Sequence, residues 1–212
     1  MKSKLAFATL LLLSLIATHS YAQKSMEWGL TAGGNDFKVG GRSWDQSYRI
    51  SFSGGAYAQL NYTKYFSIQP QLLFNQVLAK TSAGDASGGG FNGIYSNYGA
   101  VSDQLVSIDY IAVPILFVYK PVPMLSILVG PQYSFAVGQT SGLLQAMPNK
   151  NVFSRSDLAL VFGGQLNLGK MMIGLRWQEG LTNVNAINST DDWRTYGLQF
   201  YVGFKIKDHK LK

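Results

Sequence analysis

The sequence contains no cysteine, and only 14% of its 212 residues are charged. Without cysteine the chain forms no disulfide and has no thiol nucleophile, and a lipoprotein anchored through a lipidated cysteine is also excluded. Histidine is almost as scarce, with two residues. Aromatic residues make up 13%, which is high for a soluble globular protein, whereas the charged fraction is low. These features indicate that something other than water covers part of the surface.

The N-terminal segment has the parts of a secretory signal peptide. Two lysines precede an apolar stretch at residues 5–17, and the small residues Ser20 and Ala22 follow in the pattern of a cleavage site. An uncleaved anchor helix is the alternative, but the apolar stretch is short for one. We therefore predict that residues 1–22 are removed on secretion.

The positive charge of the chain is concentrated at its C-terminal end. The 18 basic and 11 acidic residues give +7, which falls to +5 without the two signal-peptide lysines. The segment KIKDHKLK carries +3 of this, so only +2 remains on the rest of the mature chain. So small a charge does not support a nucleic-acid-binding patch. We expect residues 207–212 to form a solvated basic tail on the periplasmic side, with contact to anionic lipid headgroups as the alternative.

The stretch LALVFGGQLNLGKMMIGLRWQEGL, residues 158–181, is apolar enough to suggest a membrane helix. Its polar residues and glycines disfavour a helix, and a period of two instead separates an apolar face from a polar one, as in a strand. The glycine and lysine at positions 169–170 interrupt the pattern and suit a two-residue type II′ hairpin turn. This turn places Arg176 opposite Gly163, which leaves room for the arginine side chain.

The same alternation continues along the mature chain and predicts eight strands without an intervening helix. Long and short connections alternate, so that all the long ones lie at one end. An even number of antiparallel strands, short turns at one end and long loops at the other are typical of a bacterial outer-membrane barrel. The predicted strands span residues 27–35, 51–62, 66–78, 105–119, 126–138, 157–168, 171–181 and 195–206.

One face of the predicted sheet is apolar and is expected to contact lipid. A soluble lipocalin-like barrel is the structural alternative, but its water-facing positions would be rich in charged residues. Here the alternate residues of the polar face are mostly Gly, Ser, Gln, Asn and Tyr. On the fourth strand we assign Ile108, Tyr110, Ala112, Pro114, Leu116 and Val118 to the lipid face, and on the fifth Ile127, Val129, Pro131, Tyr133, Phe135 and Val137, because neither set is charged.

Aromatic residues gather near both ends of the predicted strands, in the way that two interfacial girdles do. They are Trp28, Tyr62, Phe66 and Phe204 at the end with the short turns, and Phe52, Phe74, Phe135, Trp177 and Tyr196 at the end with the long loops.

The opposite face points into the lumen. An eight-stranded barrel is only wide enough to be filled by its own side chains, and an unpaired buried charge is costly, so we predict a hydrogen-bonded polar plug. Glu27 and Lys205 point inward near the same end of the first and last strands, and we predict that they pair where the barrel closes. The predicted plug consists of Arg176, Asp109, Asp157, Glu27, Gln165, Gln178 and Tyr201.

With these strands in place, the chain resembles the outer-membrane β-barrel domain family common in Bacteroidetes, often called PorT-like, and is similar in architecture to OmpX-type barrels. The order and spacing of short motifs carry the resemblance: WGLTAGGN, FSIQPQLLFNQ, IDYIAVPILFVYK, ILVGPQYSF, SDLALVFGGQL and GLRWQEGLTNV. It implies one all-β barrel domain at residues 23–206, located in the cell outer membrane. One member is associated with type IX protein secretion, a role that the general resemblance does not carry over.

We predict no catalytic residues, no cofactor and no metal site. After the signal peptide the only histidine is His209 in the basic tail, so neither a histidine base nor a cluster of His and Cys ligands is available. The glycine-rich segment at residues 82–104 lacks the lysine of a phosphate-binding loop and is interpreted as an external loop. Its aromatic residues Phe91, Tyr95 and Tyr98 are the candidate binding surface.

The sequence therefore predicts a monomeric, non-enzymatic outer-membrane barrel with a filled lumen. Its expected partners are outer-membrane lipid and lipopolysaccharide, with other envelope proteins as candidates, and it is not expected to bind nucleic acid. A structural or binding role through the external loops is the first hypothesis. A narrow channel for small solutes, a component of a protein secretion system and an enzyme that works without histidine are the alternatives.

Overall fold

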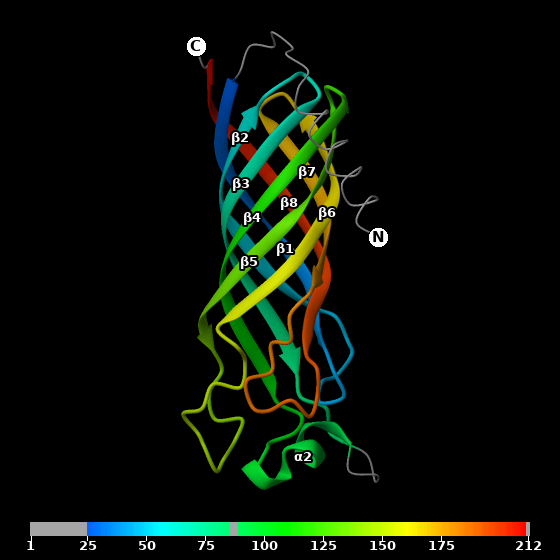
Figure 1. Ribbon diagram of the computed structural model, residues 1–212, viewed down its shortest axis with the longest axis vertical. Coiled ribbons are helices and arrows are strands. Elements are labelled where there is room, and N and C mark those ends of the chain that lie inside the picture. Colours follow the sequence, from blue (N-terminus) through cyan, green and yellow to red (C-terminus); the bar gives the residue numbers. More distant parts are fainter. Residues whose placement is uncertain (1–24, 85–88, 211–212) are drawn as a thin grey trace, which may run out of the picture.

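The computed structural model describes residues 25–84 and 89–210 as one closed antiparallel barrel, in which each strand pairs with the next and β8 returns to β1 (Figure 1). The predicted eight-stranded barrel is thereby confirmed. Among the described residues, no α-helix is long and apolar enough to cross a membrane. The strands are β1 (Ser25–Gly40), β2 (Arg49–Asn61), β3 (Phe66–Lys80), β4 (Leu105–Val122), β5 (Leu125–Gln139), β6 (Ser156–Leu168), β7 (Met171–Gly180) and β8 (Arg194–Lys210).

The connections differ in length between the two ends of the barrel, as predicted. What we call the turn end holds the short turns and the described termini of the chain, and the loop end holds the long loops (Figure 1). The loop end also carries two short elements that were not predicted, the helix α2 (Gly90–Ile94) and the 3-10 helix η1 (Ser96–Tyr98). The turns are residues 62–65, 123–124 and 169–170, and the loops are residues 41–48, 81–104, 140–155 and 181–193.

The β6–β7 hairpin has the predicted register. Gly169 takes a φ of 67°, as the first turn position of a type II′ turn requires. Gly163 lies opposite Arg176, and a Cβ atom at this glycine would lie 2.6 Å from the Cα atom of Arg176. The glycine therefore provides the space in which the arginine passes into the lumen.

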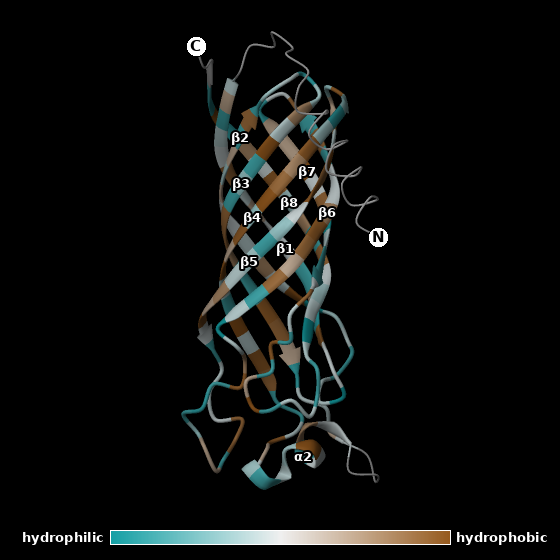
Figure 2. Ribbon diagram, viewed as in Figure 1, coloured by the Kyte–Doolittle hydropathy of each residue, from teal (hydrophilic) through white to brown (hydrophobic). Residues whose placement is uncertain are grey.

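Apolar side chains cover the outer face of the barrel, and Figure 2 shows hydrophobic and hydrophilic residues distributed along its strands. The outward side chains of β5 are those predicted, from Ile127 to Val137. All nine predicted girdle aromatics also lie on the outer face, and some contact one another: the ring centroids of Phe52 and Phe74 are 5.4 Å apart. An outer surface this apolar is suited to lipid rather than to water.

The fourth strand faces the opposite way from the prediction. Its register places Leu116 opposite Gln69 and Ala112 opposite Leu73, and directly opposed residues share a face. Both β3 residues are buried inside the barrel, so their β4 partners are buried too. The prediction assigned to lipid the set of alternate residues that carries no charge. Both sets of alternate residues on this strand are largely apolar, so the absence of charge does not identify the outer face. The parity assigned to lipid, Ile108, Tyr110, Ala112, Pro114, Leu116 and Val118, points inward, and Val113, Ile115, Phe117 and Tyr119 point outward.

The last strand is longer than predicted. It continues beyond residue 206 to Lys210 because β1 begins at Ser25 and supplies pairing partners for these additional residues. Part of the predicted basic tail is therefore strand backbone. The predicted signal peptide, residues 1–22, lies outside the described residues.

Candidate functional site at the loop end

The middle of the lumen is organised around Arg176, whose side chain is buried. Its Nε atom donates a hydrogen bond to Oε1 of Gln199, and its Nη1 atom donates one to Oε1 of Gln71 at 2.8 Å. The guanidinium also lies 5.0 Å from the centre of the Tyr201 ring, within cation–π range. Amide oxygens and an aromatic ring, rather than a carboxylate, thus surround this charge.

The predicted plug is confirmed for most of its members. Tyr201 donates to Gln165 at 2.8 Å, Gln178 accepts from Gln132 at 2.8 Å, and the buried Asp157 accepts from two threonine hydroxyls. Not every buried polar atom has a hydrogen-bond partner, however. Among the described residues, the atoms without a partner are both amide atoms of Gln69, the hydroxyls of Tyr57 and Tyr110, Trp44 Nε1, Arg49 Nε and Gln71 Nε2.

Glu27 and Lys205 form the predicted ion pair, with Nζ of the lysine 3.5 Å from Oε2 of the glutamate. They lie on β1 and β8, which pair directly and close the barrel. Asp109 was also expected in the lumen, and this prediction is wrong because the orientation of β4 was reversed. The residue lies on the outer parity near the loop end, where its Oδ1 atom accepts hydrogen bonds from Gln76 and Ser107.

Towards the loop end the interior changes from polar to apolar. Buried side chains from the upper parts of the strands continue directly into the loops and form one hydrophobic cluster. Trp193 lies at its centre and contacts the aromatic rings of Trp44, Phe91, Tyr95 and Phe153, with centroid separations of 5.0 to 6.2 Å. This cluster closes the lumen at the loop end with an apolar layer.

The four loops are joined to one another in a ring, which we call the cap. Three links between neighbouring loops are isolated β-bridges, and the fourth is a carboxylate that receives hydrogen bonds from the first loop. Backbone pairing of this kind fixes the relative positions of loops that are far apart in the sequence. The links are Trp44 with Thr81, Ala100 with Leu144, Phe153 with Asn185, and Asp191 with Ser43.

Asp191 is the polar centre of the cap. Its carboxylate accepts hydrogen bonds from the Ser43 hydroxyl at 2.6 Å, the Ser43 backbone at 2.8 Å, the Arg42 backbone at 3.1 Å and the Trp193 indole at 3.0 Å. Burial alone would raise the pKa of Asp191, but these hydrogen bonds favour the ionised form and hold the pKa below its ordinary value. The cap is therefore stabilised by an ionised carboxylate at neutral pH.

The aromatic residues of the 82–104 segment do not form the binding surface that was predicted. Phe91 and Tyr95 are fully buried, since they pack against the tryptophans of the cap. The Tyr95 hydroxyl accepts a 2.8 Å hydrogen bond from Asn185 of the last loop. Tyr98 is half-buried, with Nζ of Lys150 5.5 Å from its ring centre. These side chains hold the cap together instead of presenting it to a ligand.

The exposed surface of the cap carries more uncharged polar side chains than charged ones, which are Arg42, Asp103, Arg155 and Asp192, and it also exposes Tyr48 and Met147. It is formed by side chains that the sequence did not single out, because isolated loop asparagines and glutamines carry no motif. Amides and hydroxyls of this kind both donate and accept hydrogen bonds. The exposed polar residues include Gln46, Ser47, Asn92, Ser96, Asn97, Ser141, Gln145, Asn149, Asn151, Ser189 and Thr190.

The described residues contain no group of three or more His, Cys, Asp or Glu side chains placed to hold a metal ion.

Comparison with known families is informative about location. The model of the family described as outer membrane protein beta-barrel domain matches residues 21–186 of the chain. The chain belongs to this family. The protein is thus an outer-membrane β-barrel protein, and its apolar outer face contacts lipid.

The chain was also compared with individual proteins. None of the curated proteins matches it. Ail, the attachment invasion locus protein of Yersinia pestis, solved in complex with the heparin analogue sucrose octasulfate, is 13% identical, with a TM-score of 0.47 over 87% of this chain and 99% of that chain. Neisserial surface protein A is 13% identical, with a TM-score of 0.47 over 86% of this chain and 97% of that chain.

Proposed function

We propose that this outer-membrane barrel is a non-enzymatic binding protein that presents the cap at the cell surface. The observation that carries the proposal is the ring of links between the four loops. A surface whose loops are already held in position loses little conformational entropy when it binds a ligand. The exposed hydrogen-bonding side chains of the cap, which we call the rim, form the surface that such a ligand would contact.

The chemistry of the rim favours a polar ligand over an apolar one. Asn97 and Gln145 are exposed on neighbouring loops, which the bridge between Ala100 and Leu144 holds together. Nearby charges are partly compensated, as in the 2.5 Å ion pair between Lys80 at the end of β3 and Asp103 of the loop that follows. Glycans, including the sugar portion of lipopolysaccharide, present a matching set of hydroxyl donors and acceptors.

The orientation of the cap is testable because the chain has no cysteine. We expect a cysteine introduced by Asn97→Cys to react on intact cells with a maleimide that does not cross membranes. A cysteine introduced by Lys64→Cys, in a turn at the other end of the barrel, is the matched control and is expected to react only after the cells are permeabilised. The reverse pattern of labelling would place the cap in the periplasm and overturn the proposal.

Binding itself is testable with purified lipopolysaccharide and a panel of soluble glycans as probes. We expect the refolded protein to retain at least one probe and the double variant N97A/Q145A to lose it, since both side chains are exposed and their backbone contacts remain. The control variant Lys64→Ala is expected to bind as the wild type does. If no probe binds, or if the double variant binds normally, the polar rim is not the recognition surface.

A further inference from the structure

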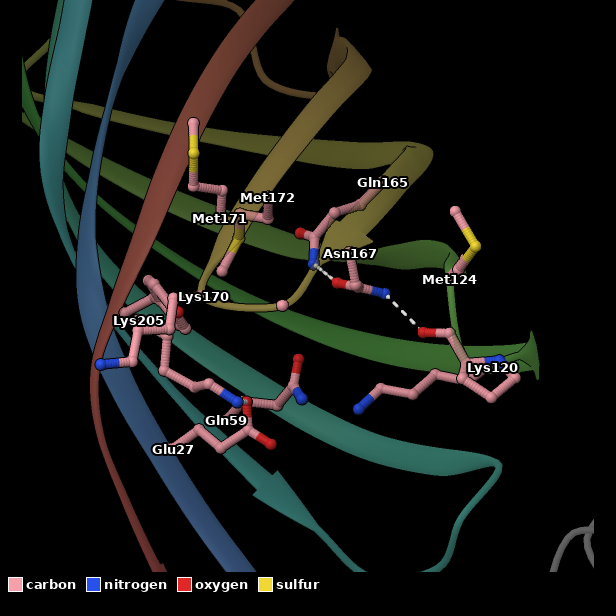
Figure 3. A pocket seen from close by; sticks show the side chains of 13 residues that line it. Glu27, Gln59, Lys120, Met124, Gln165, Asn167, Lys170, Met171, Met172 and Lys205 are labelled. Carbon is pink, nitrogen blue, oxygen red and sulfur yellow. Dashed lines mark hydrogen bonds and ion pairs between the residues drawn. The ribbon is translucent and has the colours of Figure 1, made fainter.

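The turn end of the barrel contains a cavity of about 300 Å³ inside the mouth of the lumen. Figure 3 shows that Lys120 projects from one side of the cavity, and that Glu27 and Lys205 project from the other. The turns at residues 123–124 and 169–170 form part of its rim. The cavity is thus a polar pocket at the end of the molecule opposite the cap.

Positive charge exceeds negative charge around this cavity. Three lysines line it, whereas Glu27 is the single carboxylate that does so among the described residues. That carboxylate is shared: Oε1 accepts a 3.0 Å hydrogen bond from Asn61, and Oε2 lies 3.5 Å from Nζ of Lys205. The exposed Asp208 lies 3.8 Å from the same lysine. Both carboxylates therefore form their ion pairs with Lys205. Among the described residues Lys120 forms no ion pair of its own, and Glu27 acts on it only at longer range.

Lys120 shows this imbalance most clearly. Its Nζ atom donates a 3.0 Å hydrogen bond to Oδ1 of Asn61, which is a neutral acceptor. Lys170 reaches the cavity from the exposed β6–β7 turn. An ammonium group held at a half-buried site by a neutral partner has unused capacity to bind an anion.

A neutral donor lines the cavity as well. Tyr57 is buried, and its hydroxyl makes no hydrogen bond to any described group. The lining residue Gln165 accepts a hydrogen bond from Tyr201, and the guanidinium group of Arg176 lies over the Tyr201 ring. A buried arginine bound by amide oxygens adds positive potential to the lumen, and low-dielectric walls concentrate such a field.

We propose that this cavity binds a compact anion through one carboxylate or phosphate group. The geometry supplies the ammonium group of Lys120 and the unbonded hydroxyl of Tyr57, while Lys205 on the opposite side stays paired with Glu27. The volume admits a small molecule rather than a protein segment. Charge-assisted hydrogen bonds to these groups hold the anion. The site is independent of the cap, since it lies at the other end of the barrel.

The test uses the full-length mature protein, refolded in detergent and titrated calorimetrically with inorganic phosphate and, separately, with acetate. Binding of phosphate alone would identify a phosphate site, and binding of acetate alone or of both would identify a carboxylate-accepting one. We expect Lys120→Gln to weaken binding at least about tenfold, since a hydrogen bond to a charged group is lost. Sodium chloride at the same ionic strength is the control for general screening.

The matched control is Lys64→Gln, which removes a lysine at the same end of the barrel but outside the cavity. It is expected to leave binding unchanged. If Lys120→Gln fails to refold, as judged by its migration on a gel with and without heating, Lys170→Gln in the exposed turn replaces it. Absence of binding at millimolar phosphate and acetate, or equal weakening by Lys64→Gln, would overturn the proposal.

Discussion

The hydroxyl of Ser43 donates a 2.6 Å hydrogen bond to the carboxylate of Asp191, 148 positions further along the chain. Both side chains are buried, and each belongs to a different loop of the cap. The contact closes the ring that the three β-bridges leave open. Removing this contact is therefore expected to separate the first loop of the cap from the last one, while the three bridges remain.

Replacing Asp191 by alanine tests this expectation. Loss of a buried acceptor leaves its donors unpaired, and we expect the cap to be destabilised by about 1–3 kcal/mol. Limited proteolysis of the refolded protein is expected to cleave the loops at residues 41–48 and 181–193 faster. The matched control is Asp192→Ala, because Asp192 is exposed and pairs with Arg194 at 2.9 Å close to it in the chain. Equal cleavage of the two variants would contradict the role assigned to Asp191.

The same carboxylate makes the cap sensitive to strong acid. Hydrogen bonds from Ser43, Arg42 and Trp193 outweigh burial and hold the pKa of Asp191 below its ordinary value near 3.8. The folded pKa is depressed, so the stabilisation is fully present above the unfolded value and is lost as the pH falls through the folded one. Tryptophan fluorescence is expected to change below about pH 4 in the wild type. In Asp191→Asn this transition is expected to be missing; its persistence would assign it to another group.

Trp193 is the residue on which the apolar part of the cap depends most. It is fully buried against four aromatic rings, and truncation of such a side chain costs about 3–5 kcal/mol. We expect Trp193→Ala to increase proteolysis of all four loops while the barrel still migrates differently on a gel before and after heating. Trp28→Ala, at the exposed girdle of the turn end, is the control and is expected to leave the loops resistant. Loss of the heat-dependent shift in Trp193→Ala would show that cap and barrel unfold together.

The filled lumen leads to an expectation for conductance. Side chains around Arg176 are joined by hydrogen bonds across the barrel, and the apolar cluster closes the loop end. We expect the wild type to give no stable conductance steps in planar bilayers, and Arg176→Ala, which opens a void in the middle layer, to give at most small and brief ones. Stable, reproducible steps from the wild type would support the narrow-channel alternative instead.

The sequence predicts the barrel well where the two faces of a strand differ in polarity. The β6–β7 register, the position of Arg176 opposite Gly163 and the pairing of Glu27 with Lys205 all follow from the period of two and are found in the structure. These features depend on local alternation and on strand order. Neither requires knowledge of how side chains pack.

The incorrect predictions arise where packing rather than local pattern decides. The strand β4 is largely apolar on both parities, so its orientation is fixed only by its register with β3. Phe91 and Tyr95 look like surface aromatics in a glycine-rich loop, but their environment is created by Trp44 and Trp193 from two other loops. The five-residue helix α2 is too short to produce a helical period.

The apolar layer beneath the cap closes the barrel at the loop end, so the lumen does not run through the molecule. Its cavity opens at the turn end, so a small ion that enters there leaves through the same mouth. The packed cluster around Trp193 lies between the exposed surface of the cap and the lumen. A molecule built in this way meets the two sides of the membrane with two separate surfaces, and each can change by substitution without altering what the other one meets.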